Sequence, residues 1–118
     1  MNKIGFSHGV LYRVMDVYTE EAFDVYSKSG SEIIEICINK AEEVDKLNTI
    51  ESLIKKYPYK SIHLPSNIKY RNNNQTKNVL DKISTFYSSV GSNLILVHPD
   101  VVEDWSIFDE AKRNNKVL

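Results

Sequence analysis

The residues best suited to chemistry are the three histidines, His8, His63 and His98. Two of them stand just before a proline, in His63-Leu64-Pro65 and His98-Pro99, and each ends a short apolar run. Because proline cannot continue a β-ladder, the chain is expected to turn out of a sheet at both points and leave the imidazole at the rim. Neutral imidazole is a common metal ligand, so we predict that His63 and His98, on adjacent parallel strands, converge on one metal ion.

His8 and Glu35 are candidates for the same site. We predict a substrate contact for His8, which follows the first apolar run, although a single histidine is more often a hydrogen-bonded core residue. Glu35 interrupts the apolar run 33–38, where a buried carboxylate needs a partner. Two interpretations of Glu35 stay open: a catalytic or substrate contact at the mouth of the site, or an outward polar contact with a helix. Cys37, in the same run, is expected to belong to the core.

A polar loop over residues 67–78 carries further candidates. Lys69 and Arg71 are cations among amides, so the loop can hold a phosphate or a sugar, although a solvated asparagine-rich loop has the same composition. Trp105 follows His98 closely and offers a surface on which substrate can stack. Glycine-rich phosphate motifs of the GxGxxG and GxxxxGK[ST] types do not occur, which argues against nucleotide binding of those types.

Strand-like and helix-like segments alternate along the chain and must position these side chains. The strand-like runs are short and rich in β-branched residues. The helix-like segments repeat apolar residues every three or four positions and end at Gly30, Pro58 or Gly91. We expect strands at residues 3–7, 33–38, 61–64 and 93–97, helices at 19–30, 44–57, 79–90 and 103–113, and the beginning of a fifth strand at 116–118.

A strand followed by a helix, repeated four times, predicts an α/β fold with a parallel sheet and right-handed crossovers. Two architectures fit this order: a doubly wound sheet and part of a (β/α)₈ barrel. In both, ligands bind at the carboxyl ends of the strands, and all three histidines fall there.

Composition excludes several classes of protein. The formal net charge is −1, from 15 Lys+Arg and 16 Asp+Glu, so bulk charge does not indicate nucleic-acid binding. The apolar runs are far shorter than the roughly 20 residues of a membrane span, and the N-terminus lacks the pattern of a secretory signal. Cys37 is the single cysteine, so there is no disulfide framework and we expect a cytoplasmic protein.

Four segments resemble the xylose-isomerase-like TIM-barrel superfamily, which includes sugar-phosphate isomerases/epimerases and the endonuclease IV family. They are Ile4-Gly5-Phe6-Ser7, Gly30 with Glu32-Ile33-Ile34-Glu35-Ile36, Ser61-Ile62-His63-Leu64-Pro65, and Leu94-Ile95-Leu96-Val97-His98-Pro99-Asp100, in the family's order. The resemblance implies a divalent metal, Zn²⁺ or Mn²⁺, bound by His63 and His98. It also matches Glu35 to an acidic position at the end of strand two. Asp100 departs from the glycine that commonly follows His-Pro.

The length implies a single domain that is half of a barrel. A complete barrel takes about 250 residues, so residues 1–118 correspond to one (βα)₄ half, truncated before strand five. The resemblance then implies the N-terminal half of a metal-dependent sugar-phosphate isomerase/epimerase that acts on a sugar or sugar phosphate and is inactive as an isolated chain. The alternatives are an endonuclease IV-like phosphodiesterase acting on abasic DNA and a non-catalytic half-barrel that self-assembles. Open strand edges favour a homo-oligomer or a missing second half-barrel.

Overall fold

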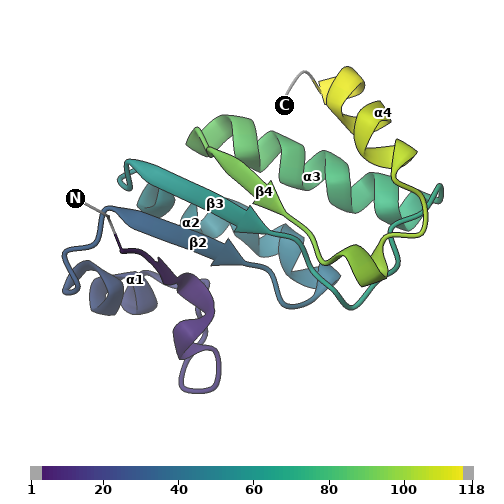
Figure 1. Ribbon diagram of the computed structural model, residues 1–118. Coiled ribbons are helices and arrows are strands. Elements are labelled where there is room, and N and C mark those ends of the chain that lie inside the picture. Colours follow the sequence, from purple (N-terminus) through teal and green to yellow (C-terminus); the bar gives the residue numbers. More distant parts are fainter. Residues whose placement is uncertain (1–3, 116–118) are drawn as a thin grey trace.

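The computed structural model describes residues 4–115, with side chains as far as residue 110. Its strands are β1 (Phe6–Ser7), β2 (Ile33–Cys37), β3 (Tyr59–His63) and β4 (Leu94–Leu96). Its helices are α1 (Glu20–Ser27), α2 (Leu47–Ile54), α3 (Asn74–Val90) and α4 (Ser106–Asn115), one after each strand (Figure 1). None of the helices in this described range is long and apolar enough to cross a bilayer.

The strands form one parallel sheet in the order β1-β2-β3-β4. The prediction of an α/β fold built from four parallel βα units is therefore confirmed. Strands that are adjacent in the sheet are also consecutive along the chain. Each βα connection therefore places the next strand on the same side of the preceding one. This is the order of strands in one half of a (β/α)₈ barrel.

The helices pack against one face of the sheet. Ile34, Ile36 and Ile62 alternate along β2 and β3 onto this face and are fully buried there. Helix α2 contacts α1 and α3, and α3 contacts α4, so the helices follow the same order as the strands. Figure 1 shows α2 and α3 behind the sheet. The hydrophobic core of the protein is the layer between the strands and these helices.

The alternate strand residues point to the opposite face, which none of the described helices covers. Strand register places Ser7, Glu35, Ser61 and Leu94 in one row, and Cys37, His63 and Leu96 in the next. We call this surface the open face; its residues are Ser7, Ile33, Glu35, Cys37, Tyr59, Ser61, His63, Leu94 and Leu96. Each of them is partly or fully exposed. A barrel would turn this face toward its interior.

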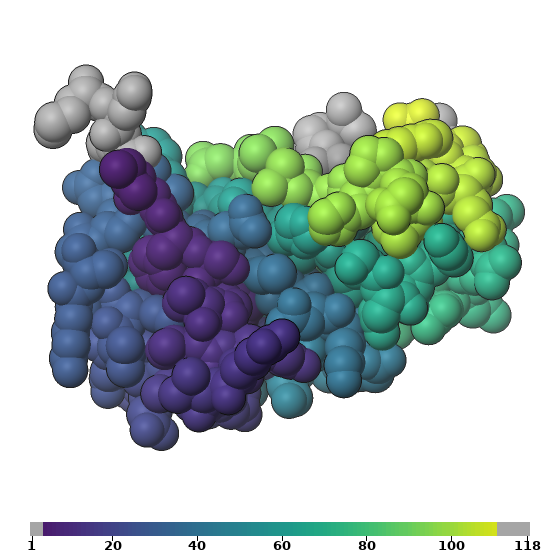
Figure 2. Space-filling view, turned by 60° about the horizontal axis from the view of Figure 1, so that its bottom comes forward, coloured from purple at the N-terminus to yellow at the C-terminus, as the bar shows by residue number. Residues whose placement is uncertain are grey.

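The two edges of the sheet lie far apart. Within residues 4–115, β1 pairs with β2 alone and β4 with β3 alone. Figure 2 shows the segment around β1 (purple) toward the left of the molecule and α4 (yellow) at the right. Four strands thus form an open sheet with two unpaired edges.

The main differences from the expected boundaries lie at β1, α2 and α3. Strand β1 begins at Phe6, and the expected fifth strand at 116–118 lies outside the described residues. A 3₁₀ turn, Ala41–Lys46, precedes α2. Helix α3 begins at Asn74, five residues early, because the side chain of Asn73 accepts a hydrogen bond from the amide of Thr76 at 2.8 Å and caps the helix.

Gly5 permits the close approach of the chain before β1 to β2. A Cβ atom on Gly5 would come within 2.4 Å of Cγ2 of Ile33 and 2.9 Å of its carbonyl oxygen. We expect Gly5→Ala to lower the free energy of unfolding by about 1–3 kcal/mol, because the clash separates β1 from β2. Gly9→Ala is the matched control, since its nearest contacts would be at 3.4 Å. Urea unfolding measures both variants, and equal stabilities would contradict the prediction.

Candidate metal site

His63 and His98 lie side by side at the carboxyl-terminal edge of the sheet. His63 is the last residue of β3, and His98 comes two residues after β4. Their ring centroids are 4.6 Å apart and the ring planes meet at 67°. Nδ1 of His63 is buried and has no hydrogen-bond partner among the described residues. The structure therefore brings the two imidazoles together, and Nδ1 of His63 has no hydrogen bond to any described group.

The sheet holds the backbone of this pair. The carbonyl of His63 accepts a hydrogen bond from the amide of Ile38 at 3.1 Å. The next amide, that of Leu64, donates to the carbonyl of Leu96 at 2.8 Å. Parallel pairing thus continues for one residue past β3 before proline ends it. His63 is fixed from both neighbouring strands.

Two imidazoles are the whole ligand set that the described chain offers here. No group of three or more His, Cys, Asp or Glu side chains within residues 4–110 is arranged to hold a metal ion. A catalytic zinc site takes three protein ligands and a water molecule. The pair can therefore form part of such a site, and the remaining ligands have to come from water or from groups outside this part of the chain.

Glu35 lies on the open face, one row below His63. Its neighbours Ile34 and Ile36 point to the helices, so alternation turns the Glu35 carboxylate away from them and toward the side on which the imidazoles lie. Cys37, in the same row as His63, is half-buried, and burial raises the pKa of its thiol. The thiol is therefore protonated near neutral pH and is a poor nucleophile.

His8 lies apart from the other two histidines. It follows β1 onto the helix side, where it is completely buried. The amide of Cys37 donates to Nδ1 of His8 at 2.8 Å, so the ring proton lies on Nε2, which has no partner among the described residues. The ring packs edge-on against Tyr18 at 5.2 Å between centroids. In this structure His8 links the ends of β1 and β2.

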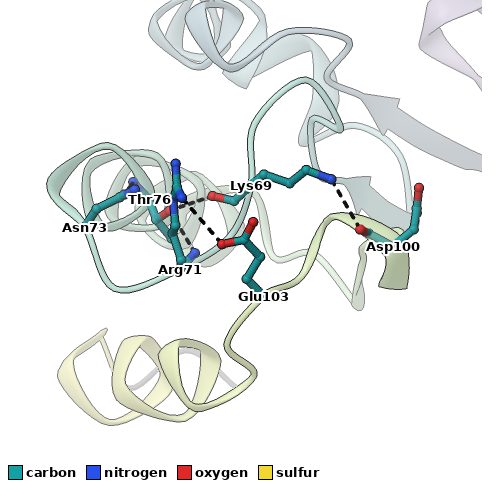
Figure 3. Close-up of polar contacts among 6 residues, drawn as sticks. All are labelled: Lys69, Arg71, Asn73, Thr76, Asp100 and Glu103. Atoms are coloured by element: carbon teal, nitrogen blue, oxygen red, sulfur yellow. Dashed lines mark hydrogen bonds and ion pairs between the residues drawn. The ribbon is translucent and has the colours of Figure 1, made fainter.

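Lys69 and Arg71 contact the loop that follows β4 (Figure 3). The guanidinium of Arg71 lies 3.5 Å from the carboxylate of Glu103, and Nζ of Lys69 donates to the carbonyl of Asp100 at 3.5 Å. Trp105 is exposed and its ring lies 5.8 Å from that of Phe108 between centroids. These side chains therefore belong to the two loops that leave the sheet at His63 and His98.

Sequence reasoning missed Tyr70, which is fully buried between these two loops. It is the one aromatic residue in the polar segment 69–78, and that isolation is the signal that could have found it. It also missed the buried hydrogen bond from the hydroxyl of Tyr18 to Glu43, at 2.8 Å. Both tyrosines support βα loops on the carboxyl-terminal side of the sheet.

The fold and this pair define an α/β protein of four parallel βα units with two adjacent histidines at the carboxyl-terminal edge of the sheet. No family model, curated protein or solved structure matches the chain.

The burial of His8 predicts a pH dependence of stability. Burial lowers the pKa of His8 from 6.5 to about 4, so between these values the unfolded chain binds a proton that the folded chain does not. Stability should therefore fall as the pH drops from about 6.5 to about 4, by roughly 2–3 kcal/mol from this residue. His8→Asn keeps an acceptor for the Cys37 amide and should lack this contribution. Urea unfolding across the pH range compares the two proteins, and parallel curves would contradict the prediction.

Proposed function

We propose that His63 and His98 hold a divalent metal ion, Zn²⁺ or Mn²⁺, at the mouth of a half-barrel of the xylose-isomerase-like type. The observation that carries the proposal is the 4.6 Å contact between their rings at the carboxyl-terminal edge of the sheet. In βα folds this edge is where ligands bind. The unpartnered Nδ1 of His63 supports it, because a buried nitrogen without a hydrogen bond is costly unless another partner is bound.

The proposed reaction is the isomerisation or epimerisation of a sugar or sugar phosphate. A metal ion bound there would polarise a carbonyl oxygen and so acidify the carbon beside it. Glu35 is the candidate for proton transfer, because it is the one carboxylate that β1–β4 place on the open face. Lys69, Arg71 and Trp105, on the surrounding loops, are the candidates for contacts with the phosphate or the sugar ring.

Phosphodiester hydrolysis at abasic DNA is the second candidate, because a pair of histidines also suits a metal that binds phosphate oxygens. A net charge of −1 gives little surplus of cations to neutralise DNA phosphates, which is why we place it second. Nicking of an abasic duplex, compared with conversion of sugar phosphates, separates the two reactions.

We propose further that a second copy of this chain supplies the missing half of the barrel. The β1 and β4 edges both lack a partner among the described residues, and unpaired edges favour strand addition. Near the β4 edge Leu94 is 52% exposed, and Ile4, before β1, is 86% exposed. A twofold axis would pair each β4 with the β1 of the other copy, giving eight parallel strands and covering both open faces.

Metal binding tests the site directly. We expect the protein to bind Zn²⁺ or Mn²⁺ stoichiometrically, and His63→Ala and His98→Ala each to weaken binding by more than about tenfold, because each removes a ligand. His8→Asn is the matched control and should bind as the unchanged protein does. Isothermal titration calorimetry gives the affinities. If no stoichiometric metal is retained and neither alanine variant differs from the unchanged protein, the metal site is wrong.

The size of the protein in solution tests the assembly. We expect a dimer or larger assembly by light scattering at micromolar concentration, and a shift toward monomer in Leu94→Lys, because the lysine would place a charge on a buried sheet face. Val25→Lys is the control, since Val25 is an exposed apolar residue on α1. A protein that is monomeric at every concentration would overturn this proposal. The metal site would be unaffected by that result, because calorimetry tests it separately.

A further inference from the structure

Tyr70 joins the loop after β3 to the turn that follows His63. Its side chain is completely buried although it stands in a polar segment. Its hydroxyl donates a hydrogen bond to the carbonyl of Pro65 at 2.6 Å. Pro65 is two residues beyond His63, so the phenol holds the backbone as it leaves the sheet. Burial raises the pKa of the Tyr70 phenol, which keeps the proton that this hydrogen bond needs.

The backbone of Tyr70 binds the other loop. Its amide donates to the carbonyl of Val101 at 2.8 Å, and its carbonyl accepts from the amides of Glu103 and Asp104 at 2.9 and 3.2 Å. Tyr70 and Val102 form a parallel bridge outside the main strands. The amide of Val101 in turn donates to the carbonyl of His98 at 3.2 Å. One residue is thus hydrogen-bonded to the segments that follow both histidines.

Packing and polar contacts surround this connection. The Tyr70 ring lies 5.8 Å from that of Phe108 between centroids, which ties the loops to α4. The hydroxyl of Thr76 accepts from the amide of Arg71 and donates to the carbonyl of Lys69, so the start of α3 holds both neighbours of Tyr70 (Figure 3). The ion pair of Arg71 with Glu103 is about half exposed on both sides and contributes little by comparison.

We propose that Tyr70 is a positioning residue for the His63–His98 pair. Its hydroxyl and backbone hold the loop after β3 against the loop after β4 and so keep the two imidazoles side by side, 4.6 Å apart between ring centroids. This inference rests on the proposed metal site. Ligands of a metal ion depend on outer contacts for their orientation, and loss of such contacts weakens metal binding by about 10- to 100-fold.

Tyr70→Phe is the variant that tests the inference, because it removes the hydroxyl and keeps the ring. We expect about a tenfold weaker affinity for Zn²⁺ by calorimetry. We also expect a weaker nuclear Overhauser effect between the two imidazole rings, measured without metal. Tyr26→Phe is the matched control: its hydroxyl also donates to a backbone carbonyl, that of His8, in a different loop. It should change neither measurement. Unchanged affinity and ring contact in Tyr70→Phe would overturn the inference.

Two further variants separate Tyr70 from its surroundings. Glu103→Gln breaks the exposed ion pair with Arg71 and should leave the affinity for Zn²⁺ unchanged. A loss equal to that of Tyr70→Phe would assign the positioning to the ion pair and overturn the inference. Should Tyr70→Phe not fold by circular dichroism, Phe108→Leu loosens the packing of the Tyr70 ring, and both measurements should shift in the same direction. Unchanged values there would also overturn it.

Failure of the metal site is distinguishable from failure of the positioning role. If His63→Ala has no effect on Zn²⁺ binding, the proposed function fails and the inference fails with it. If His63→Ala abolishes binding while Tyr70→Phe keeps both the affinity and the ring contact, the metal site stands and the inference alone is wrong.

Discussion

The connections between consecutive strands all run on one side of the sheet, and the remainder of the structure depends on this constraint. A parallel crossover is right-handed, so units that add in the same direction place every helix on the same face. The other face stays open, and the carboxyl ends of all strands reach one edge. Strand β2 shows the consequence within a few residues: Ile34 and Ile36 fill the core, and Glu35 between them lies on the open face. The same alternation builds the core and the candidate site.

The histidines show how one position along the chain changes the chemistry of a residue. His8 follows Ser7 onto the helix side, where burial keeps its ring neutral and an amide occupies Nδ1. His63 ends its strand on the open face, half-buried, with a ring nitrogen that no described group binds. The first is a structural link between strands. The second lies beside His98 at the carboxyl-terminal edge of the sheet.

The sequence predicts the elements well because periodicity and β-branching act locally, as in residues 33–38. The predicted ends of helices are wrong where a polar side chain sets them. Asn73 is expected in a solvated loop, but its side chain caps the start of α3. The meeting of His63 and His98 is predictable from strand order and from the prolines that follow them. The role of Tyr70 is not, because its partners Pro65 and Val101 are contributed by two loops that approach each other only after the sheet has formed.

The backbone of the candidate site is held firmly by hydrogen bonds, but the set of metal-binding side chains is incomplete. Hydrogen bonds from both sheet and loops fix the backbone at His63 and His98. Folding has therefore already ordered the backbone of both residues, and a metal ion proposed to bind there would not have to do so. Two imidazoles nevertheless provide neither the number of ligands nor the negative charge of a complete site. Additional parallel strands at the unpaired edges would cover Leu94 and would bring further side chains to the same mouth. In this proposal, the strands that complete the sheet also supply the side chains that complete the site.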